Sequence, residues 1–571
     1  MPVVPVLPGV AGLDGWSLWQ RGRITAANVT WSADASDSSA QQNFILTPLA
    51  VNKSYNAIRL VLSAGSNTAG WFDMLQIAQQ GWDDSSTTLV TSGQPISEIA
   101  ANIDAILVKC AQLGLGVILD CHDFLQRDQD DGSTGELWVG SNAASYRQLL
   151  QDFWTKTVTR WGPTNWPNVW SSQGQTDAAG PSPVIGYELL NEPNPDPSLT
   201  FTQMQAQEDN NWWALADKCI KAIRQLDATT PIVVDGIYYA APHGLKYFDA
   251  TSTGARGPLY DYTYSSGSGS YAFKAAADAR IVYSFHFYGP RDYTHQGVED
   301  GLYAALGLLY PLNKRTAGAV MHTRWHDGAV SSGATQKDGY LSFNGYTDLL
   351  ARVQPALDFH TNNPSVPIFV GEFSAVNPAL LGSEQVSSTA AHSRVITKIE
   401  VIDGAAKVTL QSNPSINFYP QGQNGGPYND YALAKIENAT NAAYDYSTFV
   451  AVRIEDGNPI WKTPSGAAAF QYSNPPTGTL GGGSTQVATL TLKPAASAAD
   501  IDAARCAYIK DVLQMCLTQG FSWGYWAEDG YVADAATVDT LPSGVFIGWR
   551  PSPAMSSLLT LAATRRTVSK S

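Results

Sequence analysis

The sequence contains little cysteine. Its 571 residues include five, Cys110, Cys121, Cys219, Cys506 and Cys516, with no CxxC pair and no histidine-rich cluster. An odd, scattered set does not suit a disulfide framework or a structural zinc site. Four of the five lie in helix-like stretches, and Cys121 ends an apolar strand. We therefore predict buried, unpaired cysteines that pack as small hydrophobic residues.

Charged residues are also few. They make up 15% of the chain, against 44% hydrophobic residues, which allows a substantial core and excludes a disordered chain. The net charge is −15 and the isoelectric point is near 4.9. Proteins that bind nucleic acids normally meet phosphates with lysine and arginine. We therefore predict that nucleic acid is not a partner.

Long apolar runs are missing as well. No window of about 18 apolar residues exists, so no membrane span is expected. The first five residues, Met1-Pro-Val-Val-Pro5, lack the basic and apolar regions of a signal peptide. Two compartments stay open, the cytoplasm and the exterior after removal of a signal, and the oligomeric state is unknown.

Aromatic residues, in contrast, are abundant, with 17 tryptophans and 26 tyrosines. Aromatic rings offer flat apolar surfaces with a polar edge, which suit the C–H faces of sugar rings. A large core would use many aromatics too, and composition favours neither explanation over the other.

Strand-like and helix-like segments alternate along most of the chain. The expected strands are 15–19, 56–63, 115–120, 184–191, 231–237, 280–287, 367–372 and 521–526. The expected helices are 96–113, 143–161, 211–226, 345–360, 498–519 and 552–563. Such alternation predicts a parallel sheet covered by helices. Eight strands indicate a (β/α)8 TIM barrel, and an open doubly wound sheet is disfavoured because no glycine-rich phosphate loop follows an early strand.

The alternation stops after the seventh expected strand, where β-type patterns replace helices. Two alternating runs, 395–401 and 407–410, flank Asp403-Gly404, which is a strong hairpin signal. Further strands are expected at 448–454 and 485–492. We therefore predict a catalytic barrel in two parts, 1–384 and 498–571, with a small β-rich domain inserted at 385–497. A smaller insertion is expected at 291–340.

Two phrases each place a glutamate at the end of an apolar run. One is Tyr-Glu-Leu-Leu-Asn-Glu-Pro, which contains Glu192, and the other is Pro-Ile-Phe-Val-Gly-Glu-Phe, which contains Glu372. Such runs are typical of buried parallel strands, whose carboxyl ends carry the active site of a barrel. Two carboxylates delivered by different strands can cleave a glycosidic bond.

Further polar and aromatic residues are expected at the same ends of strands, and Arg59 lies inside an apolar strand. Each one alone has an ordinary structural explanation, but together they occupy six of the eight expected strands. The full set is Arg59, His122, Asn191, Glu192, His286, Tyr288, Glu372 and Trp526.

Taken in their order along the chain, these eight residues resemble the pattern of glycoside hydrolase family 5, the cellulase family among the retaining (β/α)8 hydrolases. The motifs that carry the resemblance are Asn191-Glu192-Pro193, His286-x-Tyr288 and Gly371-Glu372-Phe373. The resemblance covers 15–375 and 498–563 and leaves out the predicted insertion. One position departs from the common pattern, since Asp123 follows His122 where many members carry asparagine. This difference leaves the exact substrate open.

The resemblance implies a retaining double displacement without metal or cofactor. Glu192 would be the general acid/base and Glu372 the nucleophile, which Arg59 and Tyr288 would keep ionised. The acid would need a raised pKa to keep its proton. The implied supporting roles are contact with the sugar 2-hydroxyl for Asn191, orientation of substrate and acid for His122 and His286, and a subsite floor for Trp526.

The predicted function is therefore hydrolysis of a β-linked glucan or related glycan, with an oligo- or polysaccharide as partner. An endo-β-1,4-glucanase is the default, while an exo-acting β-glucosidase or β-mannanase on short substrates is the alternative. A further hypothesis is a carbohydrate-binding protein without catalytic activity. Trp71, Phe72 and Trp138 fall in expected loops at the catalytic face. They are candidate subsite aromatics, with loop anchoring as the competing explanation.

Overall fold

The computed structural model describes part of the chain in detail. The described residues are 15–30, 55–62, 68–90, 93–122, 124–125, 135–195, 211–248, 262–266, 269–273, 280–289, 345–375, 498–526, the strands between 392 and 491, Thr294, Tyr310 and 558–559. The expected helix at 552–563 and the insertion at 291–340 lie largely outside them. The chain divides into two compact units, one made of 1–287, 350–374 and 512–571, the other of 288–349 and 375–511.

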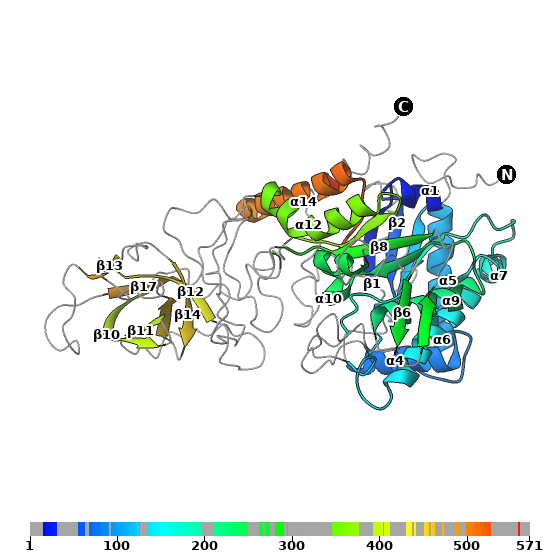
Figure 1. The fold of residues 1–571 in the computed structure, drawn as a ribbon, viewed down its shortest axis with the longest axis horizontal. Coiled ribbons are helices and arrows are strands. Elements are labelled where there is room, and N and C mark those ends of the chain that lie inside the picture. Colours follow the sequence, from blue (N-terminus) through cyan, green and yellow to red (C-terminus); the bar gives the residue numbers. More distant parts are fainter. Residues whose placement is uncertain are drawn as a thin grey trace. The chain divides into compact units, whose positions relative to one another are not determined.

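A closed barrel of parallel strands forms the core of the first unit, which confirms the predicted (β/α)8 fold (Figure 1). Around the barrel the order is β1, β2, β3, β4, β5, β8, β9 and β18. Their bounds are β1 Thr25–Thr30, β2 Ala57–Val61, β3 Gly116–Asp120, β4 Val184–Glu188, β5 Ile232–Asp235, β8 Ile281–His286, β9 Ile368–Glu372 and β18 Ser522–Tyr525.

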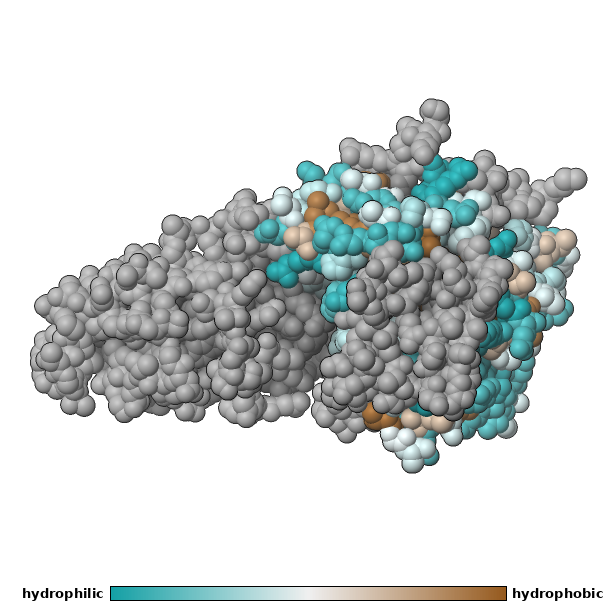
Figure 2. All heavy atoms as spheres, viewed as in Figure 1, coloured by the Kyte–Doolittle hydropathy of each residue, from teal (hydrophilic) through white to brown (hydrophobic). Residues whose placement is uncertain are grey.

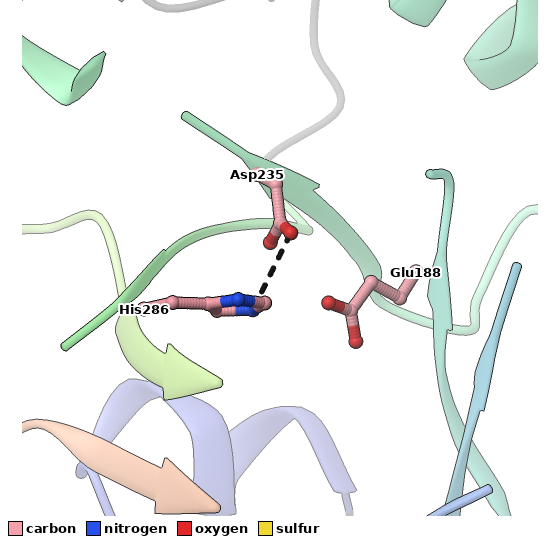
Figure 3. A group of neighbouring side chains, drawn as sticks. All are labelled: Glu188, Asp235 and His286. Carbon is pink, nitrogen blue, oxygen red and sulfur yellow. Dashed lines mark ion pairs between the residues drawn. The ribbon is translucent and has the colours of Figure 1, made fainter. Parts of the chain in front are cut away.

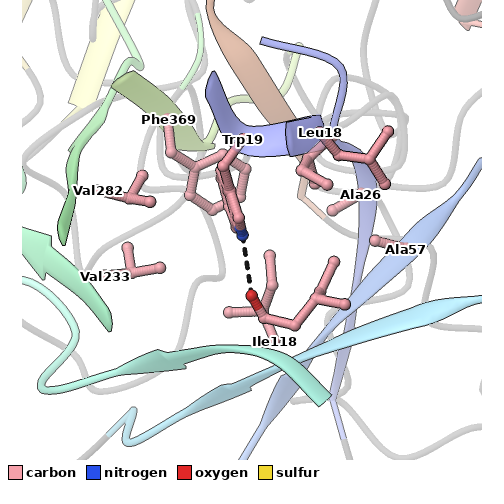
Figure 4. Close-up of a cluster of buried hydrophobic side chains, with 10 residues drawn as sticks. Leu18, Trp19, Ala26, Ala57, Ile118, Val233, Val282 and Phe369 are labelled. Carbon is pink, nitrogen blue, oxygen red and sulfur yellow. Dashed lines mark hydrogen bonds between the residues drawn. The ribbon is translucent and has the colours of Figure 1, made fainter. Parts of the chain in front are cut away.

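The expected first strand at 15–19 is wrong, because Gly15–Gln20 forms helix α1 and the first strand begins at Thr25. Leu18 and Trp19 of α1 are fully buried among residues of β1, β2, β3, β4, β5, β8 and β9 (Figure 4). The Trp19 indole donates to the carbonyl oxygen of Ile185 at 2.8 Å, and its ring meets Phe369 edge-on at 5.2 Å. A short apolar run does not distinguish a strand from a buried helix, so only this packing decides the conformation.

Helices follow the barrel strands along the chain and cover the barrel from outside (Figure 1). Helix α5 has the predicted bounds and buries one apolar stripe that includes Ile99, Ile103 and Leu107. Gly114 ends this helix in a left-handed conformation, φ 71°, which glycine adopts without steric cost. The helical bounds are α4 Thr68–Gln80, α5 Ile96–Leu113, α6 Ala143–Trp161, α7 Trp166–Ser172, α9 Trp212–Arg224, α10 Ile237–Ala240, η3 Pro242–Phe248, α12 Tyr346–Asn362 and α14 Ala498–Gln519.

Between β9 and α14 the chain forms a second closed barrel in the order β10, β11, β15, β14, β12, β17. Its strands are β10 His392–Ile402, β11 Ala405–Leu410, β12 Asp430–Ile436, β14 Val450–Glu455, β15 Asn458–Lys462 and β17 Val487–Thr491. Two short pairs complete the sheets, β13 Ala439–Thr440 with β16 Gln471–Tyr472, and β6 Tyr262–Ser266 with β7 Gly269–Phe273. The expected hairpin is present, with Ile402 opposite Ala405, while the domain limits at 385 and 497 stay a prediction.

On the face that Figure 2 shows, the described surface is mostly polar, with only small apolar areas. Large exposed hydrophobic residues among those described are Val90, Val139 and Leu226. Within the described part of the chain, no helix is both long and apolar enough to cross a membrane. None of the five cysteines, all within the described residues, forms a disulfide bond, as predicted, and each is buried except the half-buried Cys506.

Candidate active site

Glu372 reaches the site because β9 is irregular at its end. Val370 pairs with Phe285, but Glu372 pairs with His286, so β9 contains one extra residue, Gly371, at this point. Phe369 faces the barrel interior, and strict alternation would turn Glu372 toward the surrounding helices. A bulge re-aims the following side chain. The register shift therefore allows Glu372 to join the other carboxylates at the carboxyl end of the barrel.

Gly371 is required by close contacts as well as by the bulge. A Cβ atom there would lie 2.9 Å from Ser284 Oγ and 3.0 Å from His286 Nε2. We expect Gly371→Ala to displace His286 and lower turnover by about 10²-fold, the cost of misplacing a catalytic group by about 1 Å. The measurement is kcat/KM on a glycan substrate. Gly186→Ala is the matched control, because its Cβ would meet Ile118 and Val233 at an ordinary 3.5 Å. Equal losses in the two variants would contradict this role of Gly371.

Arg59 lies at the centre of the site, on β2, with its side chain fully buried. Its Nη1 donates to Glu372 Oε1 at 2.7 Å, so the predicted pairing of arginine and nucleophile is present. Its Nε and Nη2 hold both oxygens of Glu188, at 2.6 and 2.8 Å. Nη2 also donates to Asn191 Oδ1 at 2.8 Å and lies 3.0 Å from Asp120 Oδ2. The cation therefore holds residues from three strands, β3, β4 and β9, and places a positive charge beside Glu372.

Four buried residues of this network were missed by the sequence analysis: Asn28, Asp120, Glu188 and Asp235. Asn28 accepts from Arg59 Nη1 at 2.9 Å and donates to the carbonyl oxygens of Gly371 and Tyr525, both at 3.0 Å. A carboxylate as the last residue of an apolar strand was the available signal for Asp120, Glu188 and Asp235.

Glu192 lies next to Glu372, with His286 between them. His286 Nδ1 is 2.8 Å from Glu192 Oε1 and 3.5 Å from Glu372 Oε2. The facing atoms of the three residues all lie within 4.8 Å of one another. Glu192 has a positive φ of 49°, which is uncommon outside glycine and typical of functional sites. The structure therefore brings together the two predicted catalytic carboxyl groups and the histidine predicted to orient the acid.

A second group shares His286 with this pair and consists of Glu188, Asp235 and His286 (Figure 3). Burial and the negative charge of Glu188 raise the pKa of Asp235 to about 8. Burial opposes a charge on His286, but the carboxylates of Glu372 and Asp235 outweigh it and raise its pKa to about 9. Burial likewise opposes a charge on Glu188, yet Arg59 keeps the pKa of that carboxyl below its ordinary value. Asp235 and His286 therefore both hold their protons more tightly than the same groups do in water.

These shifts predict lower stability at alkaline pH. Asp235 and His286 both have folded-state pKa values above their ordinary values of 3.8 and 6.5. The folded state therefore binds protons more tightly, and this contribution to stability is lost as pH rises through about 8 and 9. We expect the melting temperature to fall between pH 6 and pH 10. Asp235→Asn, which cannot ionise, should show a shallower fall, and parallel curves for the two proteins would contradict the prediction.

The structure also places His122 and Trp526 together. The His122 ring stacks on that of Trp526 at 5.2 Å with 12° between the planes. His122 Nδ1 lies 2.7 Å from Asp120 Oδ2, and its Nε2 is 3.5 Å from Asn191 Nδ2. These two rings therefore connect β3 and β18 beside the carboxylates, as their strand-end positions predicted.

The remaining predicted residues are not brought into this group by any described contact. Tyr288 is half-buried, and its bond to Glu372 stays a prediction. Trp138 is only 1% exposed, so it anchors its turn and offers no ring face to a sugar. Trp71 and Phe72 lie in helix α4, not in a loop, and their side chains are outside the described residues, as is Asp123.

The two carboxylate–histidine groups are the metal-like clusters found among the described residues. Arg59 already binds Glu188 and Glu372, and a cation so close disfavours a metal ion on the same oxygens. We therefore interpret both groups as an internal hydrogen-bond and ion-pair network, and the predicted lack of a metal cofactor stays a prediction.

Comparison with known families decides how this geometry is classified. A family model described as cellulase, glycosyl hydrolase family 5, matches residues 20–394. The chain belongs to glycosyl hydrolase family 5. The strand-end residues of the sequence thus predicted the family correctly.

Curated relatives of this family 5 chain include proteins named endoglucanases and a cellodextrinase. Endoglucanase G of Acetivibrio thermocellus is 26% identical over 212 residues, which is 34% of the chain and 35% of that protein. Endoglucanase C of Acetivibrio thermocellus is 24% identical over 259 residues, 41% of the chain and 59% of that protein. Cellodextrinase A of Ruminococcus flavefaciens is 22% identical over 231 residues, which is 39% of the chain and 53% of that protein. The match thus spans between about a third and three fifths of these relatives.

Solved structures similar to the family 5 chain include endoglucanase Cel5A from the hyperthermophile Thermotoga maritima. The similarity covers 96% of this chain and 100% of that chain, with 11% identity and a TM-score of 0.42. A similarity this distant adds no argument, and the family assignment rests on the sequence match alone.

Proposed function

We propose that the chain is a retaining β-glycoside hydrolase, with Glu192 as general acid/base and Glu372 as nucleophile. The observation that carries this proposal is the spacing of the two carboxyl groups around His286, with oxygens within 4.8 Å. A retaining pair needs its carboxyl groups about 5 Å apart, whereas an inverting pair needs about 6.5–9.5 Å to hold a water molecule.

The surroundings of the two glutamates suit different roles. Arg59 donates to Glu372 at 2.7 Å and stabilises the charge that a nucleophile needs. Glu192 contacts His286 and has its backbone N–H bound by Asp235. In the proposed cycle Glu192 protonates the leaving oxygen while Glu372 attacks the anomeric carbon. Glu192 then removes a proton from water, which releases the sugar from Glu372.

Supporting roles are proposed for three neighbours. The Asn191 amide, fixed by Arg59, would bind the sugar 2-hydroxyl, a contact that strengthens in the transition state. The stacked rings of His122 and Trp526 would form the wall and floor of the subsite beside the cleaved bond. Aromatic rings suit this role because sugar rings present apolar C–H faces.

The proposed substrate is a β-1,4-linked glucan cleaved internally, since the relatives include proteins named endoglucanases. A second candidate is exo-type cleavage of short oligosaccharides, which the similarity to cellodextrinase A favours. A panel of β-glucans, mannans, cello-oligosaccharides and aryl β-glycosides tests both. Early products of mixed length support the endo enzyme, and one short product from the start supports the exo enzyme. Mannan as the only cleaved substrate would reject both.

The stereochemical outcome tests the mechanism separately. Proton NMR of the first products should show the β-anomer, because two displacements at the anomeric carbon preserve its configuration. Initial release of the α-anomer would reject the retaining mechanism. Binding of glycans without hydrolysis of any of them would identify a catalytically inactive carbohydrate-binding protein.

A further inference from the structure

Asp235 is a fully buried acid at the end of β5 that neither predicted catalytic role uses. Its backbone is held on both sides. The Trp212 indole donates to the Asp235 carbonyl oxygen at 2.8 Å, and the next amide, of Gly236, donates to the Ser284 carbonyl oxygen at 2.9 Å. These contacts fix the position from which the carboxyl group enters the site.

One oxygen of Asp235 reaches two parts of the catalytic group. Oδ2 accepts the backbone N–H of Glu192 at 3.0 Å and lies 3.5 Å from His286 Nε2 (Figure 3). The other ring nitrogen of His286 contacts Glu192 Oε1 at 2.8 Å. Asp235 is therefore connected to Glu192 twice, directly at the backbone and through His286 at the carboxyl group.

The backbone of Glu192 has a conformation that needs such support. A non-glycine residue with φ 49° is strained, and strained residues persist only where their surroundings hold them. Moving this residue by one torsional well would turn its carboxyl group away from the anomeric carbon. The hydrogen bond to Asp235 is a direct restraint on that movement.

The charges around Asp235 favour a hydrogen-bonding role. Glu188 on β4, His286 on β8 and Arg59 on β2 all influence its carboxyl group, and the Glu192 amide faces it. Burial and the negative charge of Glu188 raise the pKa of Asp235, so its carboxyl group holds a proton more tightly than an exposed aspartate does. In either protonation state, Oδ2 can accept the Glu192 N–H.

We propose that Asp235 is a positioning residue that holds the backbone of Glu192 and, through His286, the direction of its carboxyl group for proton transfer. The proposal rests on the proposed function, because it requires Glu192 to act as the general acid. It predicts that loss of the Asp235 carboxyl group lowers kcat/KM only for substrates whose leaving group needs a proton. A residue that merely stabilises the fold would affect all substrates alike.

The experiment compares kcat/KM for a cello-oligosaccharide and for a dinitrophenyl β-glycoside, whose leaving group departs without a proton. Asp235→Ala and Asp235→Leu both remove the hydrogen-bond acceptor. Alanine leaves space for a water molecule, whereas leucine fills that space. Two different variants are used so that the test does not depend on the folding of either one. In both variants kcat/KM for the oligosaccharide should fall about 10²-fold, which is the cost of a misplaced catalytic group. Their kcat/KM for the aryl glycoside should change little. Asp235→Asn, which keeps an acceptor, should restore most of the oligosaccharide activity.

Asp73→Ala is the matched control, because Asp73 is also buried and accepts a backbone N–H, that of Val90, at 2.6 Å. It lies outside the site network, so its activity ratio between the two substrates should equal that of the wild type. The positioning role would be overturned if Asp235→Ala and Asp235→Leu lost kcat/KM equally on both substrates. It would also be overturned if Asp235→Asn lost as much oligosaccharide activity as those two variants. A wild-type protein inactive on both substrates would instead reject the proposed function.

Discussion

Glu372→Ala is expected to abolish turnover of glycans while leaving the fold intact. Loss of a covalent nucleophile in a coordinated site lowers kcat on the order of 10⁶-fold. The side chain is only 6% exposed and ends β9, so a smaller residue leaves a cavity at the end of that strand. Residual hydrolysis of an activated aryl glycoside measures the loss. Thermal unfolding checks that the barrel persists.

Added azide distinguishes loss of the nucleophile from general damage. A small anion can enter the cavity left by Glu372→Ala and attack an activated substrate once, which gives the inverted α-glycosyl azide. Glu98→Ala is the control, because Glu98 is exposed on α5 and should keep full activity. If Glu372→Ala kept substantial glycan hydrolysis, another residue would be the nucleophile.

Arg59→Met is expected to cause the largest loss of stability. It removes the cation that contacts Asp120, Glu188 and Glu372, all of them buried. Removing one partner of a buried ion pair costs about 3–5 kcal/mol, because the remaining charge is uncompensated. Urea unfolding followed by tryptophan fluorescence measures the free energy of unfolding.

Arg21→Met is the control for Arg59→Met, because Arg21 is exposed and precedes β1. A surface change of this kind should alter the free energy of unfolding by less than about 0.5 kcal/mol. If Arg59→Met and Arg21→Met had the same free energy of unfolding, the buried carboxyl groups around position 59 would have taken up protons instead of remaining charged. In that case the loss from Arg59→Met would grow as pH rises and the carboxyl groups ionise again.

The pattern of the chain was sufficient for the barrel and for its main site residues. Apolar runs ending in polar residues located seven of the eight strands, because parallel strands are buried on both faces and end at the active site. The same pattern located Glu192 and Glu372, and an arginine inside an apolar strand indicated Arg59. In the structure Arg59 contacts Glu372, and His286 lies between Glu372 and Glu192. The first strand was missed because the neutral, partly polar run of β1 has no apolar signature, whereas the short run in α1 has one.

The sequence by itself determined the alternation of strands and helices, the family, and which residue types reach the catalytic end of the barrel. Only the tertiary structure decided how they are combined. The extra residue at Gly371 aims Glu372, the left-handed backbone aims Glu192, and Asp235 receives a raised pKa from burial beside Glu188. These features depend on register, backbone torsion and the electric field of neighbouring strands. Those quantities arise only when residues distant in sequence meet, so no local pattern contains them.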